Sequence, residues 1–112
     1  MTNKLSRENE RLLRIAHEAL EECNKLHNAT SRKKIPLDEV TRNLGLNNKQ
    51  EIQHGFDLLV EMGIIGDDGD RENMNYDENG TLMEFIEHLL ERSAQEEEEE
   101  DTEIESAYSQ PD

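Results

Sequence analysis

The sequence has few of the residues that build disulfides, zinc centres and membrane spans. Its 112 residues include a single cysteine and no tryptophan. One cysteine excludes an intramolecular disulfide and a cysteine-rich zinc site. No apolar run is long enough for a signal peptide or a membrane span. We therefore expect a cytoplasmic protein that does not enter a membrane.

Side chains that could carry out catalysis are also scarce. The four histidines lie far apart and show no spacing typical of metal ligands. No glycine-rich phosphate loop is present. The segment from Asn75 begins like a calcium loop, but Ile86 stands where that loop requires a bidentate acid. The sequence predicts no enzyme, no cofactor and no metal.

Basic residues are nearly absent from the second half of the chain. Residues 1–55 carry ten Lys or Arg against eight Asp or Glu, a net charge of about +2. Residues 56–112 carry two Arg against twenty acids, a net charge of about −18. A salt-adapted proteome is an alternative source of such acidity, but it would usually spread acids over every surface.

Apolar residues recur at helical spacing in the first half of the chain. Residues 7–27 place them on one face, and Ser6 is a suitable N-cap. Residues 37–44 repeat the pattern after Pro36, which suits a first helical turn. Gly45 can adopt the positive φ with which many helices end. We predict a long helix, a short helix and a tight turn.

Two more helices are expected downstream. Asn47 or Asn48 would cap a helix over residues 48–62, with Glu51 completing a capping box. The expected core residues of that helix are Ile52, Phe56, Leu59 and Val60. A second capping box begins at Thr81 and opens a helix that fades near Ser93.

Short strands are expected between these helices. Ile35 could pair briefly as an edge strand. Ile64 and Ile65 follow a glycine that suits a helix end, and we expect them to start a strand. Residues 74–76 would form its returning partner. Residues 66–73, which hold no apolar side chain and two glycines, would then be the tip of a β-hairpin.

This order of elements resembles the winged-helix superfamily, a helix-turn-helix fold used by small prokaryotic and phage regulators. The resemblance rests on Leu37-x-x-Val40-x-x-x-Leu44-Gly45-Leu46, on Glu61-Met62-Gly63-Ile64-Ile65, and on the strand, turn and helix beginning at Tyr76. It covers about residues 5–93. It implies a mainly α fold with a small β-hairpin over residues 1–94. The acidic residues 95–112 would form a disordered tail.

The exposed face of the third predicted helix suits contact with DNA. In a helix-turn-helix, the N-terminal part of the second helix meets base edges in the major groove. Asn and Gln can bond adenine, and Lys can donate to guanine. The base-reading candidates are Asn48, Lys49, Gln50, Gln53 and His54. The phosphate-contact candidates are Arg32, Lys33, Lys34 and Arg42.

Two functions follow from these features. The first is a winged-helix transcription regulator, possibly a homodimer, that binds double-stranded DNA through helix 48–62. The second is an acidic interaction module that binds a basic protein partner, for example as an inhibitor that imitates DNA charge. The resemblance and the polar helix face favour the first. The acidic residues 67–72 depart from a DNA-contacting wing, because phosphates would repel them.

Overall fold

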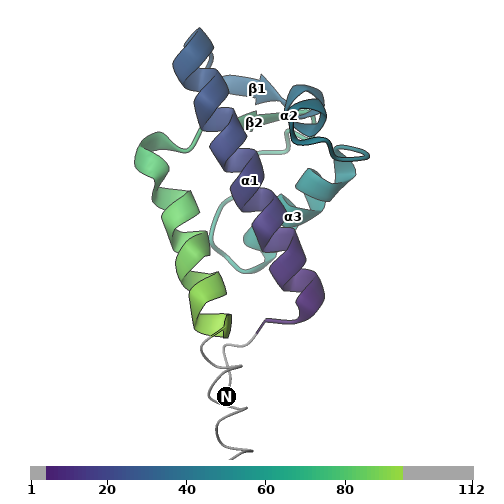
Figure 1. Cartoon of the computed structure of the whole chain (residues 1–112), viewed down its shortest axis with the longest axis vertical. Helices are drawn as coiled ribbons and strands as arrows, with labels where there is room; N and C mark the ends of the chain where they lie inside the picture. Colours follow the sequence, from purple (N-terminus) through teal and green to yellow (C-terminus); the bar gives the residue numbers. More distant parts are fainter. Residues whose placement is uncertain (1–4, 95–112) are drawn as a thin grey trace, which may run out of the picture.

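Four α-helices and a two-stranded antiparallel sheet make up residues 5–94, the part of the chain that the computed structural model describes (Figure 1). In chain order, the first elements are α1 (Arg7–Thr30), β1 (Lys34–Pro36), α2 (Leu37–Leu44), α3 (Gln50–Glu61), β2 (Asn73–Asn75) and the 3₁₀ turn η1 (Glu78–Gly80). The fourth α-helix occupies residues 81–94. None of the helices within residues 5–94 has the length and apolar character that a bilayer span needs. The predicted tail, residues 95–112, lies outside the described residues.

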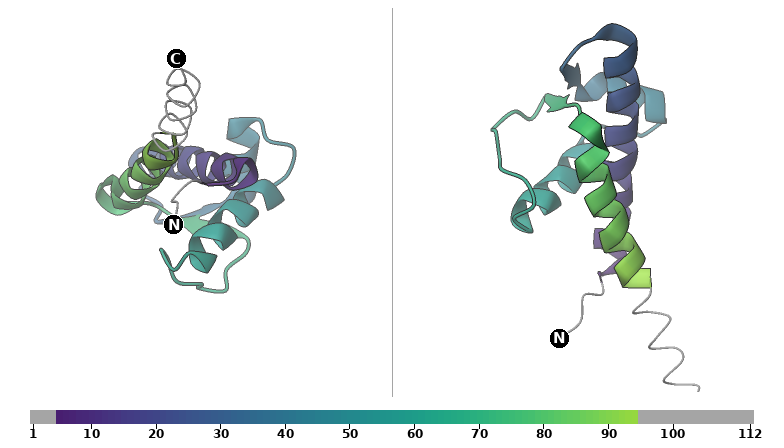
Figure 2. Two further views of the ribbon diagram at one scale, coloured as in Figure 1. Left: turned by 90° about the horizontal axis from the view of Figure 1, so that it is seen from below. Right: turned by 90° about the vertical axis from the view of Figure 1, so that its left-hand side faces the viewer.

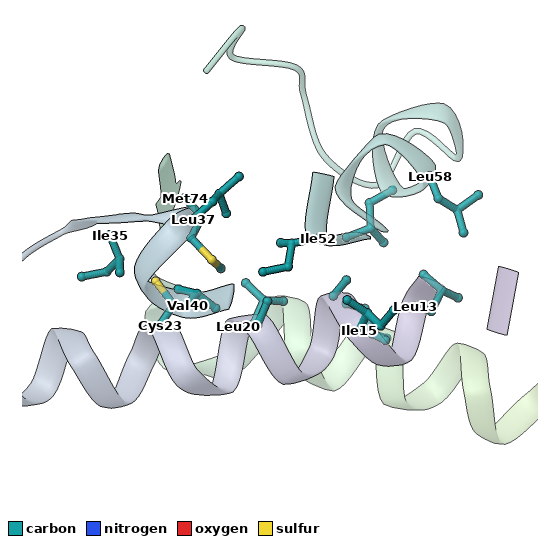
Figure 3. Packing of buried hydrophobic residues seen from close by; sticks show 14 residues of the cluster. Leu13, Ile15, Leu20, Cys23, Ile35, Leu37, Val40, Ile52, Leu58 and Met74 are labelled. Atoms are coloured by element: carbon teal, nitrogen blue, oxygen red, sulfur yellow. The ribbon is translucent and has the colours of Figure 1, made fainter. Parts of the chain in front are cut away.

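The long helix α1 is the central element, and it packs chiefly against α3 and also against α2 and β1. The Ser6 hydroxyl accepts a hydrogen bond from the Asn9 N–H at 3.1 Å, so the predicted cap is confirmed. Figure 3 shows Leu13, Leu20 and Cys23 of α1 directed toward side chains of α2, α3 and the strands. The helix continues three residues beyond the predicted end, to Thr30, and Ser31 then ends it with a φ of 62° and an N–H bonded to the His27 carbonyl.

The short helix α2 and the turn after it agree with the predicted bounds. Gly45 adopts a φ of 72°, and its N–H bonds back to the Arg42 carbonyl. The predicted cap of α3 is wrong. Lys49, and neither Asn47 nor Asn48, precedes the helix, and its backbone is already helical. A capping asparagine would accept a hydrogen bond from an N–H of the first turn, and within residues 5–94 neither Asn47 nor Asn48 does so.

The buried face of α3 is rotated relative to the prediction. Ile52 and Leu59 are fully buried, as expected. Phe56 and Val60 are only half-buried, whereas Gly55 and Leu58 are buried. Gly55 lies against α1 so closely that a Cβ there would come within 2.8 Å of the Leu12 carbonyl oxygen. α3 therefore contacts α1 at Gly55. As a result, the next residue, Phe56, lies closer to the surface than predicted.

The sheet pairs different strands from those predicted. Ile35 does form a short strand, but β1 pairs with β2, and Ile35 lies opposite Met74. Residues 64 and 65 form no strand, so the predicted hairpin is wrong. The observed pairing is favoured because it buries apolar side chains. Pairing β1 with β2 places Ile35 and Met74 in the core at 0% and 6% exposure.

The helix at residues 81–94 lies antiparallel to α1. Asn24 bonds the backbone of Asp77, and the His17 ring lies 2.7 Å from a Glu87 oxygen. At the far end, the buried Ser93 hydroxyl accepts from the Leu5 N–H at 3.0 Å. Figure 1 shows the two helices side by side.

The N-terminus of that last helix is capped by a residue other than the predicted one. The Asp77 carboxylate accepts hydrogen bonds from the N–H groups of Leu82 and Met83, at 3.0 and 2.7 Å. Thr81 makes no such bond. Its hydroxyl reaches the Glu78 carbonyl at 3.4 Å. The turn η1 brings Asp77 back over the helix end, so the predicted capping box at Thr81 is wrong.

Candidate nucleic-acid interface

Residues 66–73, hereafter the acidic loop, lie against several of the predicted DNA-contacting residues. The Lys34 ammonium of β1 bonds an Asp70 carboxylate oxygen at 2.9 Å. The Lys49 ammonium bonds Glu72 and lies 3.9 Å from an Asp38 oxygen. Two of the predicted cations therefore already have carboxylate partners. We call the surface formed by α3, the acidic loop, Lys34 and Lys49 the α3–loop face.

The acidic loop is also fastened to α3 and α2. The Gln53 amide of α3 donates to the Arg71 carbonyl oxygen. The Arg71 guanidinium in turn bonds both carboxylate oxygens of Asp57 on the next turn of α3. The Leu37 N–H, at the start of α2, donates to the Glu72 carbonyl at 2.8 Å. Contact with a base would require Gln53 to leave the loop.

Three aspartates of the acidic loop build the loop itself. The Asp67 carboxylate accepts from the Gly69 N–H at 2.8 Å, and the Asp68 carboxylate from the Asp70 N–H at 2.9 Å. Asp70 accepts from the N–H groups of Glu72 and Asn73 at 3.0 and 3.1 Å. Each bond closes an Asx-type turn, in which a carboxylate substitutes for a backbone acceptor. These acids are structural, and they also set the charge of the face.

Ion pairing changes the titration of the groups on this face. The hydrogen bond from Lys34, together with backbone N–H donors, lowers the pKa of Asp70 to about 2. The hydrogen bond from Arg71 lowers the pKa of Asp57. The hydrogen bond to Glu72 raises the pKa of Lys49. All three groups are therefore charged at neutral pH.

The remaining candidates divide into one paired residue and five exposed ones. The Arg32 guanidinium makes two bonds to the Glu39 carboxylate, at 3.0 and 2.8 Å, away from the acidic loop. Five candidates are exposed and make no ion pair with any other residue between 5 and 94. These are Lys33, Arg42, Asn48, Gln50 and His54. Asn48 precedes α3, whereas Gln50 and His54 lie on it.

Charge on the α3–loop face is negative in sum. Its carboxylates belong to Glu51, Asp57, Glu61, Asp67, Asp68, Asp70 and Glu72, and its paired cations to Lys34, Lys49 and Arg71. Seven negative charges therefore meet three positive ones. An approaching phosphate backbone would have to displace carboxylates and would still meet unpaired acids.

The residues that define this face were only partly foreseeable. The aspartate and glycine spacing of the acidic loop is a turn signal, and the Asx turns could have been predicted from it. The pairing of Asp70 with Lys34, or of Glu72 with Lys49, joins residues far apart in the sequence. No local pattern indicates those partners.

Metal-ligand groups and the single thiol are two further features of the described residues. Within residues 5–94, no group of His, Cys, Asp or Glu is arranged to hold a metal ion. Burial raises the pKa of the Cys23 thiol to about 11, so the thiol stays protonated and poorly nucleophilic. Comparison of this chain with protein families, curated proteins and solved structures gave no match.

Proposed function

We propose that this chain is an acidic protein-interaction module of winged-helix type that binds a basic partner protein in the cytoplasm. The observation that carries the proposal is the α3–loop face, where seven carboxylates outnumber three cations and where the acidic loop already binds Lys34, Lys49 and Gln53. The helix pair α2 and α3, joined through Gly45, and the small sheet support the winged-helix assignment.

The charge of the whole chain supports the same function. Residues 56–94 alone hold eleven Asp or Glu against Arg71 and Arg92. A negative field of this kind raises the rate at which a positively charged partner is captured, and it repels nucleic acid. Each exposed ion pair contributes only about 0–1 kcal/mol. A multivalent basic partner could therefore replace these pairs at small cost.

The test compares two labelled probes by fluorescence anisotropy at low salt. One is an unstructured peptide rich in lysine and arginine, and the other is a random-sequence DNA duplex. We expect the full chain to bind the peptide, with affinity that falls as salt rises, and to leave the duplex free. Duplex binding without peptide binding would overturn the proposal.

Matched charge variants separate the α3–loop face from the general acidity of the chain. Asp67→Asn with Asp68→Asn removes two charges and keeps an oxygen acceptor for each Asx turn. Glu18→Gln with Glu91→Gln removes two exposed charges from α1 and the last helix. Peptide affinity should fall several-fold more for the loop pair than for the helix pair. Equal losses would mean that attraction is diffuse.

DNA binding is the second candidate, and one observation favours it. Asn48, Gln50 and His54 are exposed around the start of α3, where base-reading residues of a helix-turn-helix lie. A sequence-selection experiment with a randomised duplex library addresses it directly. Enrichment of one motif, lost on Gln50→Ala, would establish DNA as the ligand.

A further inference from the structure

A pocket lies between α3 and the segment that returns to β2. The chain leaves α3 through Gly63, at a φ of 76°, and arches outward before it enters β2. Figure 2 shows this arch standing away from α3 in the right-hand view. The enclosed space has a volume of about 260 Å³.

Apolar and acidic side chains both line the pocket, together with polar ones and with Arg71, which is paired with Asp57. We call Asp67 and Asp68 its acidic rim. Phe56, Val60 and Ile65 line it as half-buried side chains, so each keeps apolar surface that the fold does not cover. The same pocket is bordered by Asp67 and Asp68. Neither of these aspartates makes an ion pair with another residue in the range 5–94. A lining that is partly apolar and partly acidic complements a group that has an apolar part and a positive charge.

We propose that this pocket receives one apolar side chain of the basic partner, next to a lysine or arginine that meets the acidic rim. The inference rests on the proposed function and names the contact through which it acts. A volume of 260 Å³ is below the range of about 300–1,000 Å³ typical of small-molecule sites. A single bulky side chain fits this size better than a metabolite.

Charge distinguishes this occupant from a segment of the same chain. Residues 95–112 carry nine acids and no base. Their charge has the same sign as the rim, so electrostatic repulsion opposes their entry. A leucine next to a lysine brings a positive charge, which is opposite to the charge of the rim, and the apolar surface that the pocket can cover.

The experiment uses two peptides that differ at one residue. Both are rich in lysine and arginine, and one carries a central leucine where the other carries serine. We expect the leucine peptide to bind the full chain about tenfold more tightly, because burying a leucine is worth about that factor or more. Equal affinities would contradict the pocket.

Variants at the pocket mouth locate the effect. Gly66 borders the pocket, has ordinary negative-φ geometry, and a Cβ there meets no atom within 4 Å. Gly66→Trp should abolish the leucine advantage and keep the charge-driven binding, whereas Gly66→Ala should keep both.

A second variant is a control for the case in which the introduced tryptophan points away from the pocket. Val60→Gln makes one wall polar without changing the net charge, and it should also remove the leucine advantage. If both variants keep that advantage, the side chain binds elsewhere and the pocket proposal is wrong. If neither peptide binds the unaltered chain, the proposed function itself fails.

Discussion

At the residue scale, Gly55 sets how closely α3 approaches α1. A Cβ at this position would lie 2.8 Å from the Leu12 carbonyl oxygen and 3.2 Å from the Ala16 Cβ. The nearer atom belongs to the backbone of a helix, so it cannot swing aside as a flexible side chain could. The glycine thus permits a helix crossing that any other residue would widen.

Gly55→Ala should therefore destabilise the fold. Alanine gains about 1 kcal/mol of helix propensity, but the overpacking costs about 1–3 kcal/mol. We expect a net loss of stability, measured as a lower melting temperature by circular dichroism. Gly66→Ala is the matched control, because its Cβ enters open space. A melting temperature that is unchanged or raised in Gly55→Ala would show that α1 and α3 can move apart freely.

Asp70 gives the acidic loop a dependence on pH. Its pKa in the folded chain is about 2, below the usual 3.8, chiefly because of the hydrogen bond from Lys34. A carboxyl that is more acidic when folded stabilises the fold above its unfolded pKa. That contribution should be complete above about pH 4 and should disappear as the pH falls toward about 2.

The Asp70→Asn variant isolates this contribution. Asparagine keeps an acceptor for the Glu72 and Asn73 N–H groups but has no charge to share with Lys34. Stability of the two proteins should differ at neutral pH and converge in acid, as measured by urea denaturation at several pH values. A difference that stays constant across that range would indicate that the charge of Asp70 contributes nothing.

At the element scale, Asp77 fixes where the last helix begins. Its carboxylate satisfies two N–H groups of the first turn, and its backbone N–H donates to Asn24 of α1. The same residue therefore caps the helix and ties it to α1. It is 9% exposed, which strengthens each of these bonds by excluding water.

Asp77→Ala should cost about 1–2 kcal/mol, which is in the range of a lost N-cap. Thr81→Ala should change stability by less than about 0.5 kcal/mol, because Thr81 is exposed and makes only a long bond to Glu78. Thermal unfolding of the two variants provides the comparison. The reverse order would restore Thr81 as the cap.

Elements with local signals could be predicted from the sequence, whereas those that depend on distant partners could not. The apolar spacing of α2 and the glycine after it placed that helix correctly, because both signals act within a few residues. The pairing of Ile35 with Met74 depends on where the core lies. The docking of the acidic loop depends on Lys34 and Lys49, which no local rule joins to Asp70 and Glu72.

At the scale of the whole molecule, self-repulsion opposes folding. The net charge is −16, and the two halves of the sequence share it unequally. The ion pairs in residues 5–94 are mostly exposed, and such pairs contribute about 0–1 kcal/mol each. Repulsion among the excess acids should exceed this gain, since it involves many more pairs of charges.

Added salt should therefore stabilise the protein. Screening weakens the repulsion and the ion pairs together, and we expect the melting temperature to rise with sodium chloride. A chain that ends at residue 94 lacks nine acids and should show a smaller rise. A melting temperature that falls with salt would indicate that the ion pairs dominate.

The antiparallel contact between α1 and the helix at residues 81–94 has a consequence for synthesis on the ribosome. The bond between the Leu5 N–H and the Ser93 hydroxyl joins groups 88 residues apart. While the chain emerges, α1, α2 and α3 can pack before that last helix exists. Until it arrives, the part of α1 that will cover the buried Ile86 stays open to solvent. The nascent chain therefore leaves this part of α1 exposed until nearly all of the described residues have been made.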